Sequence, residues 1–410
     1  MLTGSHRIFP GMNVAAADRA HAWHPFTPID SWLDPAYEPV VIQSGRGAEL
    51  VDTDGRVYLD GNSSIWTNIH GHNHPKLNAA LRDQLDRVAH VSFLGLTHEP
   101  AVRLAAELAR LADGSVRHRV FFSDDGSTAM ETGLKLAYQY WQQNGAPQRT
   151  RFLSLEGGYH GDTVGAMSIG HSPAFHSTYA NLLFKSEKVM APACYRCPFN
   201  QAKPEPADAR TYRKCQWQCL QLLREKVQRN RNAYAAVVLE PRVQGTAGML
   251  MHPDGYLARA AEIVHQSGAF LLLDEVLTGF GRTGTLLACQ REGVVPDLIA
   301  LAKGLTGGYL PLAATLATER IFDGFRGAPE RTFFHGHSYT ANPLGCAVAL
   351  ASLQLFRGEN TLGGVAKRAA QLQEECRVFW NHPNVGAVRQ EGLILAVELL
   401  EDRALRRPFD

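Results

Sequence analysis

Short runs of apolar residues alternate along the chain with longer stretches whose apolar positions recur at helical spacing. The runs of buried-strand type are 119–122, 151–155, 235–239, 270–273 and 298–302. Helical spacing predicts helices over 77–88, 100–111, 128–141, 256–266, 342–357 and 364–380. Strands that alternate with helices indicate an α/β fold, in which helices cover both faces of a mainly parallel sheet.

Both ends of the chain depart from this alternation. Residues 48–60 have the pattern of a β-hairpin, with Asp54-Gly55 at its turn. Residues 393–398 form a last apolar run near the C-terminus and predict a final strand. We therefore expect residues 1–75 to form an arm and a small sheet of their own.

The composition describes a globular protein that is large enough for two packed regions. The 410 residues are 45% hydrophobic and 20% charged. Because 41 basic residues face 40 acidic ones, no net field attracts nucleic acid or an acidic membrane. No apolar run reaches the ~18 residues of a transmembrane helix, and residues 1–7 lack the apolar core of a signal peptide. We expect a cytoplasmic protein that binds neither nucleic acid nor membrane.

Two of the apolar runs end in ionisable residues. Run 270–273 leads directly into Asp274, and run 298–302 leads into Lys303. Burying a carboxylate and an amine is costly unless each has a partner. Pyridoxal phosphate (PLP) satisfies both, because its ring nitrogen takes a carboxylate and its aldehyde takes an amine. A structural Asp–Lys pair at the edge of the sheet is the alternative on these residues alone.

A Gly-Ser turn follows the first predicted strand and suits a phosphate group. Gly126 and Ser127 stand where a helix begins, so that free backbone N–H groups and the helix dipole face an anion. An ordinary serine N-cap is the alternative, and it is the commoner use of a single Gly-Ser. The carboxylates of Asp124 and Asp125 would repel phosphate, so they must point elsewhere or cap the helix.

An aromatic residue and an imidazole follow run 151–155. Tyr159 and His160 lie at the carboxyl end of that predicted strand, where α/β sheets bind ligands. Tyr159 is suited to stack on a planar ring. His160 is equally well explained as a hydrogen-bonded loop residue.

The cysteines leave a question of metal binding open. Seven cysteines, an odd number, are typical of a reducing compartment rather than of a disulfide framework. Four of them cluster at spacings that a metal ion can use: Cys194, Cys197, Cys215 and Cys219. A structural metal ion and four reduced cysteines in a surface loop are the alternatives, and the second is favoured. Three alternate histidines lie in a loop without a nearby carboxylate or cysteine, so we expect no metal at His70, His72 and His74.

Taken together, these segments resemble the class III aminotransferases of fold type I, which use PLP. The motifs that carry the resemblance are 273–276, 279–284 and Lys303-Gly304, and the similarity extends from about Trp23 to the end. Within the family, the chain is similar to the subfamily that aminates 8-amino-7-oxononanoate in biotin synthesis. The segments for that similarity are 23–27, 64–66, 158–163 and 335–339.

The resemblance implies a domain plan and a set of site residues. The plan has a large PLP-binding domain over 76–341, with a mainly parallel seven-stranded sheet, and a small α+β domain built from 1–75 and 342–410. Lys303 binds the cofactor aldehyde and moves a proton. Asp274 keeps the ring nitrogen protonated. The other implied roles are phosphate binding by Gly126 and Ser127, ring stacking by Tyr159, phosphate contact from a neighbouring subunit of a homodimer by His337 and Ser338, and substrate contact by Trp66 and Gly336 as well as by Tyr159 and Lys303.

Two positions differ from the family pattern. Phe26 stands where some relatives have a tyrosine whose hydroxyl helps to recognise the substrate. In the family a further helix and strand follow the region of Glu398, and that strand carries the arginine that pairs with the substrate carboxylate. Arg407-Pro408 follows Glu398 too closely to take this role. We expect either a shortened C-terminal part or another way of binding the carboxylate.

The expected function is therefore amino transfer in two half-reactions that convert 8-amino-7-oxononanoate to 7,8-diaminononanoate. The sequence leaves the donor open between S-adenosylmethionine and lysine. One alternative is a class III aminotransferase that acts on an ω-amino acid or diamine with a 2-oxo acid acceptor. The other is a non-catalytic or catalytically impaired member of the family.

Overall fold

The computed structural model describes residues 12–112, 116 and 118–409. Residues 1–7, for which we expect no leader segment, lie outside this part of the chain. The described residues divide into two compact units. The first comprises residues 12–64 and 71–74, and the second comprises residues 65–70 and 75–409.

The N-terminal unit contains a small antiparallel sheet. Its strands pair in the order β1 (Ile42–Arg46), β2 (Glu49–Asp52) and β3 (Val57–Leu59), and its helices are α1 (Val14–His21) and α2 (Ile29–Leu33). The turn between β2 and β3 is the predicted one: Gly55 has a φ of +83°, and Asp52 Oδ1 accepts hydrogen bonds from the backbone N–H groups of Asp54 and Arg56. The hairpin expected over 48–60 is therefore present.

The second unit is organised around a seven-stranded sheet with the order β4-β12-β11-β10-β7-β5-β6. β10 pairs in parallel with β11 and β7, and β5 pairs in parallel with β7 and β6. β12 runs antiparallel to both of its neighbours. The expected mainly parallel sheet is thus confirmed. The strand bounds are β4 (His118–Ser123), β5 (Arg151–Leu155), β6 (Glu187–Val189), β7 (Tyr234–Leu239), β10 (Phe270–Asp274), β11 (Leu298–Leu301) and β12 (Ala313–Thr318).

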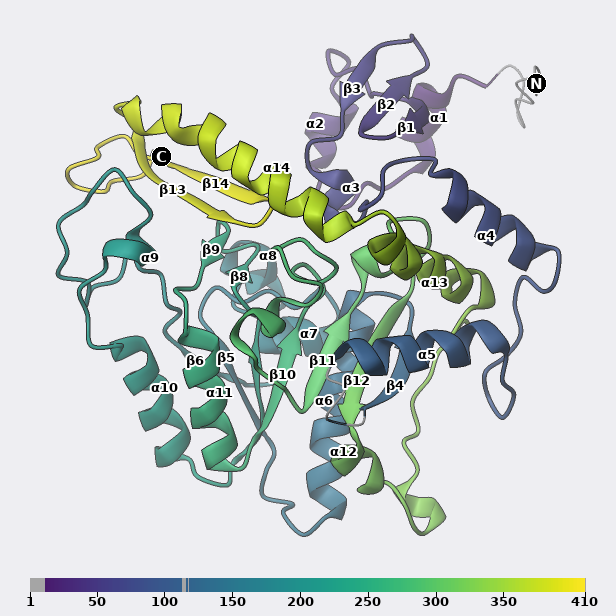
Figure 1. Cartoon of the computed structure of the whole chain (residues 1–410), viewed down its shortest axis with the longest axis vertical. Coiled ribbons are helices and arrows are strands. Elements are labelled where there is room, and N and C mark those ends of the chain that lie inside the picture. Colours follow the sequence, from purple (N-terminus) through teal and green to yellow (C-terminus); the bar gives the residue numbers. More distant parts are fainter. Residues whose placement is uncertain (1–11, 113–115, 117, 410) are drawn as a thin grey trace. The chain divides into compact units, whose positions relative to one another are not determined.

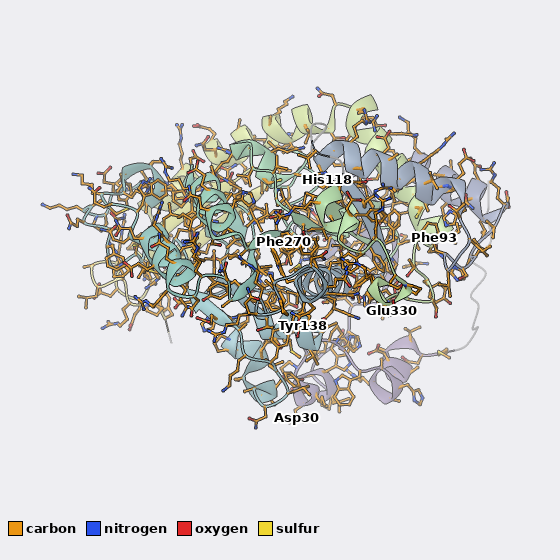
Figure 2. The ribbon with its side chains drawn as sticks, turned by 90° about the horizontal axis from the view of Figure 1, so that it is seen from below. Asp30, Phe93, His118, Tyr138, Phe270 and Glu330 are labelled. Carbon is orange, nitrogen blue, oxygen red and sulfur yellow. The ribbon has the colours of Figure 1, made fainter. Side chains whose placement is uncertain are left out.

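Helices cover both faces of this sheet, as Figure 1 shows. In β10, Leu271 and Leu273 belong to the core shared with α5 (Glu99–Ala112), α10 (Gln218–Arg229), α11 (Tyr256–Ser267) and α13 (Pro343–Gly358). Phe270 and Leu272 belong to the opposite core, shared with α6 (Gly126–Gln143), α7 (Val164–Ile169) and α12 (Glu319–Asp323). Both sides of the strand are therefore buried, which explains the unbroken apolar run; Figure 2 places Phe270 deep among the side chains.

Shorter elements and two further helices complete the chain. They are α3 (Ser63–Trp66), α4 (Pro75–Leu85), α8 (Pro173–His176), η1 (Ser177–Tyr179), α9 (Ala209–Tyr212), β8 (Val243–Gln244), β9 (Leu250–Met251), η2 (Ala288–Glu292), η3 (Lys303–Thr306), η4 (Pro329–Arg331), α14 (Thr361–Glu375) and η5 (Cys376–Asn381). Within the described ranges, no helix has the length and apolarity that crossing a bilayer requires.

A buried ionic network fastens the C-terminal hairpin to the region beside the sheet. The hairpin consists of β13 (Val385–Glu391) and β14 (Ile394–Leu399), which pair antiparallel. Arg242, 1% exposed, donates from Nε and Nη2 to the carboxylate of Glu391 at 2.9–3.1 Å and from Nη1 to Glu292 Oε1 at 2.7 Å. Both carboxylates are buried, so each needs a counter-charge: Glu292 pairs with Arg242, whereas Glu391 also pairs with Arg210 and Arg291.

We predict that Arg242→Met destabilises the protein strongly. The substitution leaves Glu292 buried without its guanidinium and takes one of three arginines from Glu391, and it should cost about 3 kcal/mol in the free energy of unfolding, measured from urea transitions. Arg407→Met is the matched control, because Arg407 pairs with Glu401 at the surface and should lose less than about 1 kcal/mol. Equal losses in the two variants would contradict a structural role for the network.

Candidate active site

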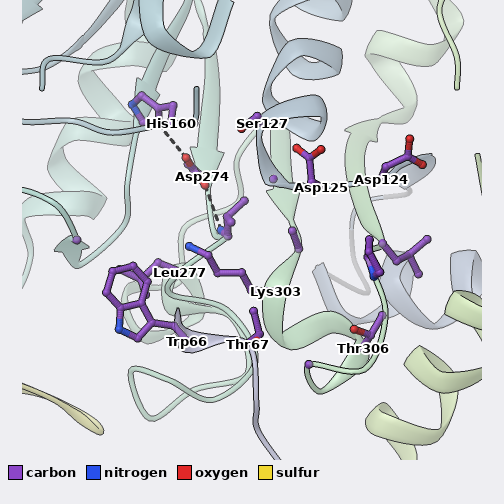
Figure 3. A pocket seen from close by; sticks show the side chains of 18 of the residues that line it. Trp66, Thr67, Asp124, Asp125, Ser127, His160, Asp274, Leu277, Lys303 and Thr306 are labelled. Atoms are coloured by element: carbon purple, nitrogen blue, oxygen red, sulfur yellow. Dashed lines mark hydrogen bonds and ion pairs between the residues drawn. The ribbon is translucent and has the colours of Figure 1, made fainter. Parts of the chain in front are cut away.

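The carboxyl-terminal edge of the parallel strands opens into one cavity of about 490 Å³. Residues that follow β4, β5, β7, β10 and β11 line it, because parallel strands deliver their carboxyl ends to the same edge. Of the residues predicted from the sequence, those in the lining are Trp66, Gly126, Ser127, Tyr159, Asp274 and Lys303 (Figure 3). The acid and the amine, 29 residues apart in the chain, therefore share one site.

Asp274 is the buried carboxylate at the end of β10 and is 5% exposed. Its Oδ2 accepts a hydrogen bond from Nδ1 of His160 at 2.8 Å, and its Oδ1 accepts one from the backbone N–H of Val276 at 3.1 Å (Figure 3). Two donors thus fix the orientation of an acid that burial alone would penalise. His160, which the sequence pattern explained equally well as a loop residue, is a direct partner of the predicted acid.

Lys303 begins the 3₁₀ turn η3 directly after β11. Its φ of +44° lies in the left-handed region, where a residue with a Cβ is strained. Desolvation lowers the pKa of its amine, an effect that the carboxylates of Asp274 and Glu240 partly oppose. A lowered pKa raises the share of neutral amine, the form that reacts with a carbonyl. The ammonium nitrogen lies 5.0 Å from the centroid of the Trp66 ring.

The turn at the start of α6 has the features of an anion cradle. Asp125 caps this 18-residue helix through a capping box with Thr128, so the cap is not Ser127. A Cβ on Gly126 would come within 2.7 Å of the Val276 side chain, and a Cβ on Gly161 would collide with Ser127 Oγ. Glycine at these two positions therefore allows close packing around the first turn of α6, where Gly126 and Ser127 line the cavity and the free backbone N–H groups of a helix N-terminus suit an anion.

Tyr159 is held in the cavity wall through its backbone and through its hydroxyl. Its N–H donates to Glu240 Oε1 at 3.0 Å, and its hydroxyl donates to Asp162 Oδ2 at 2.7 Å. Burial, followed by the hydrogen bond to Asp162, raises the pKa of the phenol well above its ordinary value. The hydroxyl consequently stays protonated at neutral pH and serves as a donor.

Glu240 is a second buried carboxyl group in the cavity, at the end of β7. Its two oxygens accept from the backbone N–H groups of Tyr159 and Gly245, each at 3.0 Å. Burial, with the nearby charge of Asp274, raises the pKa of this carboxyl to about 7. The sequence showed only that a predicted strand ends at Glu240. Glu240 shares a cavity with Asp274 and Lys303 because β7, β10 and β11 are neighbours in the sheet, an order that the sequence pattern does not give.

Three of the predicted residues do not line the cavity of this chain: Gly336, His337 and Ser338. The backbone N–H of His337 donates to Thr340 Oγ1 at 2.9 Å, and its Nδ1 lies 3.6 Å from Asp124 Oδ2. Asp124 thus has a partner other than a phosphate group, and Asp125 is the helix cap.

The cysteine cluster comes together without metal-binding geometry. Cys194, Cys197, Cys215 and Cys219 have free thiols and line one pocket of only about 10 Å³. Among the residues that the structure describes, no three His, Cys, Asp or Glu side chains are placed to hold a metal ion. The alternate histidines have other partners: His70 contacts Ser352, and His72 contacts Asp60.

The residues of the cavity fit PLP. Asp274 can face a protonated ring nitrogen, Lys303 can reach an aldehyde, and the start of α6, which lines the cavity at Gly126 and Ser127, can take a phosphate group. Bound PLP would thus give each buried ionisable group a partner: the ring nitrogen for Asp274 and the aldehyde for Lys303.

Comparison with known proteins agrees with this chemistry. The family model described as aminotransferase class-III matches residues 33–409. The adenosylmethionine-8-amino-7-oxononanoate aminotransferase of Geobacter sulfurreducens is 46% identical over 96% of this chain and 85% of its own length. The crystal structure of the enzyme of that name from Methanocaldococcus jannaschii superposes with a TM-score of 0.88 at 36% identity, covering 97% of this chain and 86% of that one. A PLP-bound amine transaminase from an uncultivated Pseudomonas species superposes with a TM-score of 0.86 at 37% identity, covering 95% and 86%.

We predict that Glu240 makes the stability of the protein depend on pH. In the unfolded chain the carboxyl ionises near pH 4.5, whereas in the fold it keeps its proton to about pH 7. Stability should therefore fall as pH rises from 4.5 to 7, by up to about 3 kcal/mol. Glu240→Gln should remove this dependence, so that its denaturation midpoint rises relative to wild type between pH 5 and pH 8.

The control for this measurement is Glu225→Gln, which changes an exposed carboxylate on α10. Its midpoint should follow that of the wild type at every pH. A constant offset between Glu240→Gln and wild type from pH 5 to pH 8 would show that Glu240 ionises normally in the fold.

Proposed function

The chain belongs to the class III aminotransferases, fold-type-I enzymes that use PLP, and we propose that it aminates the ketone of 8-amino-7-oxononanoate to give 7,8-diaminononanoate in biotin synthesis. The name of the Geobacter relative, adenosylmethionine-8-amino-7-oxononanoate aminotransferase, supports this substrate. One observation carries the proposal: Asp274 and Lys303 stand at the ends of paired neighbouring strands and line one cavity beside the start of α6. That cavity combines an acid, an amine and an anion cradle.

When bound, PLP supplies an aldehyde that reacts with amines and a ring that withdraws electrons from the adjacent carbon. Lys303 provides the amine that holds the aldehyde carbon and, when released, the base that moves a proton from the donor carbon. Asp274, oriented by His160, keeps the ring nitrogen protonated. Gly126 and Ser127 bind the phosphate group through the start of α6, and the ring of Tyr159 stacks on the cofactor.

We further propose that the enzyme works as a homodimer whose site is completed across the interface. His337 and Ser338 would reach the phosphate of the neighbouring subunit, and Gly336 would border its substrate. The exposure of large apolar side chains in the same segment supports this, since Phe334 is 80% and Tyr339 is 61% exposed. A cytoplasmic location remains a prediction from the sequence.

The amino donor is proposed to be S-adenosylmethionine, which is part of the name of both relatives, with lysine as the alternative that the sequence motifs left open. A second function is supported by a specific observation. The amine transaminase from Pseudomonas is as similar to the chain as the M. jannaschii enzyme, so an amine donor with a 2-oxo acid acceptor is the competing activity.

We predict that PLP-loaded protein loses its aldehyde absorbance within one turnover when S-adenosylmethionine or lysine is added. β-Alanine and putrescine should leave the absorbance unchanged. Addition of 8-amino-7-oxononanoate should then restore it, with 7,8-diaminononanoate identified by mass spectrometry. A response to putrescine and to pyruvate, with none to the ketone of the biotin step, would support the competing activity instead.

The same experiment includes two lysine variants. Borohydride should fix the cofactor on Lys303 in the wild type, and Lys303→Ala should show neither the adduct nor turnover. Lys226→Ala, which removes a lysine of α10 that pairs with Glu187, should behave as wild type. An adduct located at any other lysine would refute the assignment of the reactive amine.

We predict that Asp274→Asn slows amino transfer while the fold persists. An adjacent anion shifts a pKa by about 1–3 units, so losing it should lower the protonated fraction of the ring nitrogen and the half-reaction rate by roughly 10- to 1000-fold. Stopped-flow absorbance with saturating donor measures this rate. Asp83→Asn, an exposed position on α4, is the control. An Asp274→Asn rate within about twofold of wild type would exclude the proposed role.

A further inference from the structure

His176 lies behind the Tyr159 side chain. It ends α8, is 6% exposed, and its ring stacks on the Tyr159 ring with centroids 5.8 Å apart and planes 21° apart. Its Nε2 donates to Asp162 Oδ1 at 3.1 Å. Its Nδ1 is buried and has no hydrogen-bond partner in the described part of the chain. The hydrogen bond to Asp162 is therefore the one that this imidazole makes with the described residues.

Asp162 connects this histidine to the cavity wall. Its Oδ2 accepts from the Tyr159 hydroxyl at 2.7 Å, while its Oδ1 is held by His176. Its backbone N–H donates to Ser127 Oγ at 3.3 Å, which ties the same residue to the anion cradle. Asp162 therefore contacts both the tyrosine of the cavity wall, through its carboxylate, and the serine at the start of α6, through its backbone.

The carboxylate of Asp162 needs an anchor to do this. Its side chain is 47% exposed, so water competes for both oxygens and the group can rotate about its terminal bond. A buried donor on Oδ1 stops that rotation and leaves Oδ2 aimed at the tyrosine. The stacked imidazole also restricts the Tyr159 ring from the side.

We propose that His176 is a positioning residue for PLP binding: acting through Asp162 and through its stacked ring, it fixes the plane and the hydroxyl direction of Tyr159. His176 does not line the cavity, so it can act on a bound cofactor only through Tyr159 and Asp162. This inference rests on the proposed function, because it assigns Tyr159 to the ring of the cofactor. It deepens that assignment by naming what holds the tyrosine.

The test compares variants that separate the donor from the ring. His176→Phe keeps an aromatic ring against Tyr159 but loses the Nε2 donor, whereas His176→Gln keeps an N–H donor at similar reach. PLP dissociation constants come from titration of apoprotein, and the absorption maximum of the bound cofactor is recorded for each variant. We expect His176→Phe to weaken PLP about tenfold and to shift the maximum, and His176→Gln to recover most of both.

Double variants show the route of the effect. In a Tyr159→Phe background there is no hydroxyl to hold, so adding His176→Phe should weaken PLP by less than about twofold. Asp162→Ala should reproduce the loss seen with His176→Phe, which keeps the test decisive if one variant folds poorly. Thermal melting of every variant establishes that the comparison is between folded proteins.

Two results would overturn the inference. One is a His176→Phe protein with wild-type PLP affinity and spectrum; the other is an undiminished effect of His176→Phe in the Tyr159→Phe background, which indicates packing alone. Failure of the proposed function is distinguishable, because wild-type protein would then bind no PLP at Lys303. In that case Tyr159 has no cofactor ring to meet and the inference falls with the function.

Discussion

The site depends on burying an acid and an amine at the ends of adjacent strands. Asp274 and Lys303 end β10 and follow β11, which pair in parallel, so geometry places both groups at one edge of the sheet. Taking each out of water is unfavourable, and the chain offsets this with local donors: His160 and the N–H of Val276 on the acid. A ligand with a cationic ring nitrogen and a carbonyl carbon completes the compensation.

Around this pair, the loops of the site hold one another rather than standing free. Glu240 joins the backbone of Tyr159 to that of Gly245, and Asp162 joins Tyr159 to Ser127. Three segments of the cavity wall, those after β5, after β7 and at the start of α6, are thus tied to one another. Such ties keep reacting groups in place before substrate arrives, which is where positioning contributes most to rate.

The sequence predicted what is local and missed what depends on long-range contact. β7, β10 and β11 were predictable because both faces are buried and their runs are wholly apolar. β12 and β13 were not predicted: β12 is rich in alanine and reverses direction, and β13 mixes polar with apolar residues. No spacing rule joins His160 to a carboxylate 114 residues away. The cysteine spacing, likewise, did not determine whether four thiols meet in metal geometry.

The electrostatics of the cavity form one coupled system. Lys303 must lose its proton to act as a nucleophile, yet each nearby anion makes that loss harder, and both Asp274 and Glu240 oppose the effect of burial. Because burial raises the pKa of Glu240 to about 7, this carboxyl is protonated in about half of the molecules at pH 7 and in most of them at lower pH. Protonated Glu240 still accepts hydrogen bonds from the backbone N–H groups of Tyr159 and Gly245, so it continues to hold the two loops together when it carries no charge. Protonation of Glu240 therefore removes one of the two charges that oppose deprotonation of Lys303, so the amine and this carboxyl are coupled through the cavity.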